Sequence, residues 1–127
     1  MRADAEPLAA QVRKLCHLRG AELVVEGQER EVSPEAALAM FRVVQEALTN
    51  AAKHAPGAPL RVTLSFAADA VQVDVGNGPA AAEAGALAGT GSGYGLDGIR
   101  ERMRLVGGRV EAGPDGGGWL VEARLPL

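Results

Sequence analysis

A chain of 127 residues is the size of one domain, since domains commonly hold about 100–150 residues. Its net charge of −3 argues against broad nucleic-acid binding, and its single cysteine excludes an internal disulfide or a multi-cysteine zinc site. No apolar run approaches the ~18–20 residues of a membrane span, and the N-terminus lacks a signal-peptide pattern, so we expect a cytoplasmic domain without membrane contact.

Hydrophobic periodicity in the first half of the chain predicts two helices separated by a strand. Apolar residues at helical spacing predict a helix over residues 7–19, followed by a short strand over 21–25. A second helix is predicted over Pro34–His54, because Ser33 can cap its first N–H groups and Pro34 has no N–H to lose. The buried stripe of this second helix is expected to be Ala37, Phe41, Val44, Leu48 and Ala51.

The second half of the chain predicts two hairpins with a helix between them. Alternating apolar and polar residues predict strands over 60–66 and 70–75. A helix over 95–106 follows, and then two strands over 109–112 and 119–125 around a Gly-Pro-Asp-Gly turn. The order of elements predicts an α/β two-layer sandwich, with a mixed, largely antiparallel sheet of about five strands and three helices on one face.

One face of the second helix carries a carboxylate, an amide, an ammonium and an imidazole. At 100° per residue these four side chains gather within roughly 60° of the point opposite Leu48; they belong to Glu46, Asn50, Lys53 and His54. The pattern fits a solvated helix face. It also fits a site for Mg²⁺ and its attached phosphates, in which amide or carboxylate oxygen reaches the metal and the ammonium reaches phosphate.

Glycine is concentrated rather than spread along the chain. The 17 glycines are about twice the usual share of roughly 7%, and many lie between residues 76 and 98, in what reads as a long loop over 76–94. This loop leads through Gly91-Ser92-Gly93-Tyr94-Gly95-Leu96 directly into a helix. Such a segment can cradle a phosphate with backbone N–H groups, or it can simply need glycine for flexibility. Trp119 is expected in the core or on the sheet rather than as a stacking platform.

Several segments together resemble one protein family. The residues from Glu46 to His54 (EALTNAAKH) resemble the N-box of sensor histidine kinases, and those from Gly91 to Leu96 resemble their glycine-rich G2 box. The segments GIRER, LVGG and ARLP, which start at Gly98, Leu105 and Ala123, resemble the DesK-like group that is paired with NarL-type response regulators. The resemblance runs from about Leu38 to the C-terminus and is to the catalytic ATP-binding (HATPase) domain with the GHKL, or Bergerat, fold.

The resemblance implies a role for each matching residue. Asn50 would ligate Mg²⁺ that bridges the ATP phosphates, Glu46 would orient metal-bound water or neighbouring groups, and these two would form the catalytic pair. Lys53 and His54 would lie near the phosphates or ribose. Residues 79–94 would form the ATP lid, whose end would meet the phosphates with backbone N–H groups. The cofactor-binding residues implied at this end are Gly91, Gly93, Tyr94, Gly95 and Leu96, and the backbone N–H contacts to phosphate would come from Gly93, Gly95 and Leu96.

Two positions depart from the family pattern at the adenine end of the expected site. The family's G1 box usually presents an aspartate in D-x-G that accepts a hydrogen bond from the adenine amino group. Here Asn77, followed by Gly78, stands at that place, so the acceptor would be an uncharged amide. The family also often has a threonine after its last run of glycines, where this chain has Trp119.

The function implied is phosphoryl transfer from ATP to a histidine on a separate dimerisation domain. Neither His17 nor His54 stands in a phosphoacceptor-like sequence such as E-L-H-D. We therefore expect residues 1–127 to be one catalytic domain, with the phosphoacceptor and sensor domains absent, that does not phosphorylate itself in isolation. Expected partners are the phosphoacceptor domain and a NarL-type response regulator. Two alternatives stay open: a regulatory domain like the GHKL anti-sigma factors, and a degenerate domain without catalysis.

Overall fold

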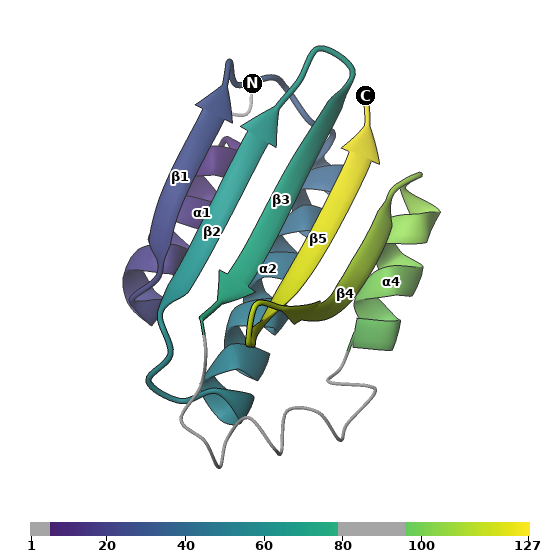
Figure 1. Ribbon diagram of the computed structural model, residues 1–127. Coiled ribbons are helices and arrows are strands. Elements are labelled where there is room, and N and C mark those ends of the chain that lie inside the picture. The colour runs from purple at the N-terminus through teal and green to yellow at the C-terminus, as the bar shows by residue number, and fades with distance from the viewer. Residues whose placement is uncertain (1–5, 79–95) are drawn as a thin grey trace.

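The computed structural model describes residues 6–78 and 96–127, which form one layer of helices against one sheet (Figure 1). The elements are α1 (Leu8–Arg19), β1 (Glu22–Gly27), α2 (Pro34–His54), β2 (Leu60–Phe66), β3 (Ala70–Asn77), α4 (Leu96–Leu105), β4 (Arg109–Asp115) and β5 (Gly118–Pro126). Every predicted helix and strand is present, most with ends shifted by one to three residues. The predicted lid over 79–94 lies outside the described residues.

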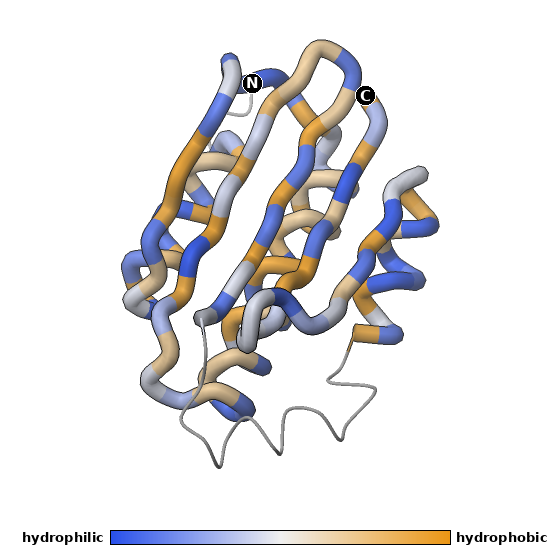
Figure 2. Tube along the Cα trace, in the orientation of Figure 1, coloured by the Kyte–Doolittle hydropathy of each residue, from blue (hydrophilic) through white to orange (hydrophobic). Residues whose placement is uncertain are grey.

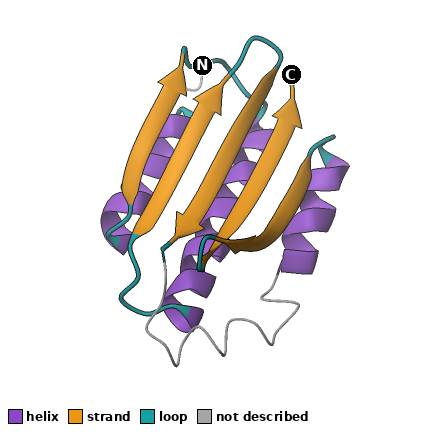
Figure 3. Ribbon diagram, viewed as in Figure 1, coloured by secondary structure: helices purple, strands orange, loops and turns teal. Residues whose placement is uncertain are grey.

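The five strands form a single mixed sheet in the order β1-β2-β3-β5-β4. The edge strand β1 runs parallel to β2, and the other three pairings are antiparallel. The parallel pair arises because α2 is the connection between β1 and β2, and a parallel pairing needs such a long crossover. The three helices all cover the same face of the sheet (Figure 3), so the predicted two-layer sandwich is confirmed.

The core lies between the two layers and is centred on α2. The expected stripe on α2 is partly wrong, because Ala37 and Phe41 are only half-buried. Val44, Leu48 and Ala51 are buried as expected, and five positions outside the expected stripe are buried too: Ala36, Ala39, Met40, Val43 and Ala47. The helix contacts both α1 and α4 as well as the sheet, so neighbours on three sides bury a wider arc than a helix on a sheet alone would hide.

Hydrophobic and hydrophilic residues alternate along the strands (Figure 2). Burial alternates in the same way along β2 and β5, so the more exposed side chains lie on the sheet face away from the helices. Charged side chains pair across it, as in the 3.0 Å contact between Arg61 Nε and Glu22 Oε1. Pairs of this exposed kind contribute little to stability. Within the described residues, no helix combines the length and apolar character needed to cross a membrane.

Local sequence sets both ends of α2. At its start the Ser33 Oγ accepts a hydrogen bond from the Ala36 N–H at 3.2 Å, as the capping pattern predicts. At its end Pro56 and Gly57 stop the helix, since proline cannot continue it and Gly57 has a φ of 81°. The last two turns of α2 therefore pass over the ends of β3 and β5 that lie at the same edge of the sheet (Figure 1).

The strands β3 and β5 approach each other closely at this same edge. Asn77, the last residue of β3, is the register partner of Trp119. A Cβ placed on the neighbouring Gly118 would lie 1.9 Å from the Asn77 carbonyl oxygen. Only glycine fits there without moving backbone.

Gly118→Ala is expected to destabilise the protein, because the new methyl group forces β3 and β5 apart. Overpacking of this kind costs about 1–3 kcal/mol, and urea unfolding followed by circular dichroism measures it. Gly113→Ala is the matched control, since a Cβ at Gly113 in β4 would meet nothing within 4 Å. Equal unfolding free energies for the two variants would contradict the close approach.

Candidate functional site

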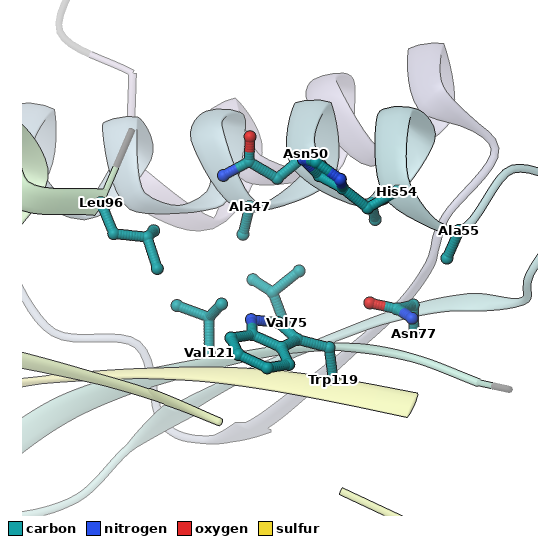
Figure 4. Close-up of a pocket in the computed structure, with 10 residues that line it drawn as sticks. Ala47, Asn50, His54, Ala55, Val75, Asn77, Leu96, Trp119 and Val121 are labelled. Atoms are coloured by element: carbon teal, nitrogen blue, oxygen red, sulfur yellow. The ribbon is translucent and has the colours of Figure 1, made fainter. Parts of the chain in front are cut away.

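A pocket lies between the C-terminal half of α2 and the adjacent ends of β3 and β5 (Figure 4). Among the described residues, its polar lining consists of Asn50 and His54 from α2, Asn77 from β3 and the indole of Trp119 from β5. Small and aliphatic side chains, among them Ala47 and Val121, make up the remainder. Ligand sites typically combine such an apolar lining with a few polar groups that converge on it.

Asn50 and His54 reach the pocket because they lie one turn apart on the same side of α2. Both are half-buried. The other two members of the predicted polar group do not line the pocket: Lys53 is exposed and Glu46 is half-buried elsewhere on the helix. The roles expected for Glu46 and Lys53 stay predictions.

Asn77 presents an oriented amide at the end of β3. Its Nδ2 donates a hydrogen bond to the Gly78 carbonyl at 3.1 Å, and the Gly78 N–H in turn donates to the Pro59 carbonyl at 2.9 Å. Because the amide nitrogen is engaged outside the pocket, the Oδ1 atom points into it (Figure 4). The Gly78 carbonyl therefore fixes the orientation of the Asn77 amide, while the Gly78 N–H is already hydrogen-bonded to the Pro59 carbonyl.

Trp119, which stands at the adenine end of the site implied by the family resemblance, lies in the wall of the pocket. The residue is half-buried, packs against the hydrophobic core and contributes to the lining. Alternation along β5 could have indicated the correct face, because Trp119 shares a side of the strand with the buried Val121 and Ala123. Its proximity to Asn77 depends on the register between β3 and β5 and has no local signal.

Leu96 closes the pocket on the side of α4. It is the first residue of α4, is 2% exposed and lines the pocket. The backbone contact to phosphate that the resemblance implies for Leu96 stays a prediction. The other predicted residues of this segment, Gly91, Gly93, Tyr94 and Gly95, lie outside the described part of the chain. What they contact stays a prediction.

The single cysteine does not belong to the site. Cys16 is buried in α1 against the core. Burial raises the pKa of its thiol, an effect that the nearby Arg13 partly opposes. The thiol therefore stays protonated near neutral pH and acts as a small apolar core residue.

Comparison with solved structures places this fold among histidine kinase domains. The catalytic domain of histidine kinase ThkA superposes with a TM-score of 0.67 at 16% identity, over 95% of this chain and 92% of that one. The histidine kinase domain of the Escherichia coli osmosensor EnvZ gives 0.66 at 19%, over 98% and 92%. The domain from the Erythrobacter litoralis blue-light activated kinase EL346 gives 0.65 at 24%, over 95% and 61%. At these identities the likeness is one of fold.

No match was found among curated protein sequences. The sequence model described as "Histidine kinase-, DNA gyrase B-, and HSP90-like ATPase" matches residues 35–127, which include α2 and all four strands from β2 onward. The match covers most of the chain and every described residue of the pocket. The chain belongs to the family of histidine kinase-, DNA gyrase B- and HSP90-like ATPases.

Proposed function

We propose that this chain is the catalytic domain of a two-component sensor histidine kinase, which binds Mg²⁺ and ATP and donates the γ-phosphoryl group to a histidine on a separate dimerisation domain. The observation that carries the proposal is the pocket in which Asn50 and His54 face Asn77 and Trp119. Membership of an ATPase family and the fold shared with histidine kinase domains support it.

The β3 end of the pocket suits a nucleobase. Asn77 offers a fixed acceptor, Oδ1, whose orientation is held by the hydrogen bond from Nδ2 to the Gly78 carbonyl. An amino group on a base can donate to this oxygen. The acceptor is uncharged, and charge-assisted hydrogen bonds are roughly twice as strong as neutral ones. Asn77 alone would therefore hold a base less firmly than an aspartate.

The opposite end of the pocket suits a metal ion with phosphates. Mg²⁺ is usually held by one or two protein oxygens together with phosphates and waters, so the Asn50 amide oxygen is an adequate protein ligand. The described residues contain no group of three or more His, Cys, Asp or Glu side chains that could form a dedicated metal cage. When bound, Mg²⁺ would neutralise charge on the transferring phosphoryl group.

The dipoles of two helices favour a cation at one place in the pocket and phosphate at another. Asn50 lies near the C-terminus of α2, whose partial negative charge favours a cation. Leu96 begins α4 and lines the pocket, so the partial positive end of that helix faces the same space and favours phosphate. The exposed ammonium of Lys53, also near the end of α2, adds positive charge for phosphate. Glu46 would orient water on the metal.

The chain would supply position and charge rather than a nucleophile. Phosphoryl transfer depends almost entirely on positioning and electrostatic stabilisation, and the accepting imidazole would come from the dimerisation domain of the same kinase. A NarL-type response regulator would then take the phosphoryl group in a cytoplasmic phosphorelay. The segments that begin at Gly98, Leu105 and Ala123 support that choice of partner.

Asn50→Ala is expected to weaken binding of ATP in the presence of Mg²⁺ by tenfold or more, because the metal loses its protein oxygen. Isothermal titration calorimetry measures this, with wild-type dissociation constants expected below about 1 mM. Gln45→Ala truncates another amide on α2 that does not line the pocket, and it should bind as the wild type does. A wild-type protein that binds no ATP would favour the degenerate domain instead.

The isolated chain is expected to bind ATP without phosphorylating itself, because the accepting histidine belongs to another domain. Incubation with ATP labelled at the γ-position, followed by acid-free electrophoresis, tests this. The chain carries two histidines, so His17→Ala and His54→Ala identify the source of any label. Strong labelling that one of these substitutions removes would contradict transfer to a separate domain.

A further inference from the structure

We infer that Trp119 is the surface on which the base of the bound nucleotide stacks, so that this chain holds the base mainly by aromatic contact. The inference rests on the proposed function and concerns the end of the pocket where the sequence departs from its family. It assigns a binding role to a side chain that the sequence pattern alone placed in the core or on the sheet.

The first observation is the position of the Trp119 indole in the pocket. Trp119 comes from the second residue of β5 and stands opposite Asn77 in the register of the sheet. Figure 4 shows the ring extending from β5 along the floor of the pocket toward Val121, with Asn50 and His54 on the α2 side. A flat guest that enters between the helix and the sheet therefore meets the indole.

The second observation is that the ring packs against the hydrophobic core while staying half-buried. Val75 and Val121, each 3% exposed, belong to the core beside it. Gly118 keeps β3 and β5 in close approach next to the ring. A ring packed in this manner loses little further freedom when a ligand binds, which favours affinity.

The third observation is that the neighbouring hydrogen-bond acceptor, Asn77, is uncharged. Asn77 offers one uncharged oxygen to the base, and a neutral hydrogen bond is weaker than a charged one. Stacking of a base on an aromatic side chain supplies affinity without any charge, since every base has a π-face. The aromatic contact and the neutral acceptor lie side by side, so the first can offset the weakness of the second.

The chain contains one tryptophan, so its intrinsic fluorescence reports on this ring alone. In the intact protein, addition of ATP with Mg²⁺ is expected to change tryptophan emission, with a midpoint equal to the dissociation constant from calorimetry on the same sample. Tripolyphosphate with Mg²⁺ carries the phosphates without a base. It should leave the emission unchanged even where calorimetry detects its binding.

Substitutions of Trp119 distinguish stacking of the base on the indole from a role of Trp119 in packing alone. Trp119→Leu keeps an apolar side chain and removes the ring, and it is expected to weaken ATP binding by about tenfold to a hundredfold. Trp119→Phe retains an aromatic face and should lose less than tenfold, which keeps the test valid if the leucine variant folds poorly. Leu120→Ala is the matched control, because Leu120 lies next in β5 and does not line the pocket.

The outcomes distinguish the two proposals. ATP binding by calorimetry with unchanged emission, an equal emission change with tripolyphosphate, or equal affinity in folded Trp119→Leu would each overturn stacking and leave the proposed function standing. Absence of any ATP binding to the wild-type protein in calorimetry would overturn the proposed function and the stacking role together.

Discussion

The burial of α2 against the sheet is the constraint on which the rest of the structure depends. Val43 and Val44 are 0% exposed and Leu48 is 1% exposed, so the rotation of the helix about its axis is fixed by its apolar side. Each residue turns a helix by about 100°, and a shift of one position would carry Asn50 and His54 away from β3 and β5. The packing of the core therefore orients Asn50 and His54 toward the ends of β3 and β5.

The same helix creates the space that the site needs. Its first half fills the core with larger side chains such as Met40 and Val43, whereas its last turns present Ala47 and Ala51 to the ends of the strands. Small side chains next to a packed core leave a hollow between the helix and the ends of the strands. An alanine-rich helix end and a rigid core thus account together for a pocket at this edge of the sheet.

Sequence reasoning located the features that local chemistry determines and missed those that depend on neighbours. The limits of α2 follow from the Ser33 cap and the Pro56-Gly57 stop, and the structure has the same limits. By contrast β4 runs to Asp115, three residues beyond its predicted end, because pairing with β5 carries it through Pro114. The local pattern placed Trp119 only in the core or on the sheet, and the family resemblance alone put it at the adenine end, because its proximity to Asn77 follows from a register between distant segments.

The central claim is that the pocket between α2 and the ends of β3 and β5 holds a nucleotide. A crystal structure of the protein with Mg²⁺ and a non-hydrolysable ATP analogue tests it most directly. We expect the base to lie against Trp119 with its amino group near Asn77 Oδ1, and the metal to lie on the Asn50 oxygen. An analogue bound away from these three side chains would contradict it.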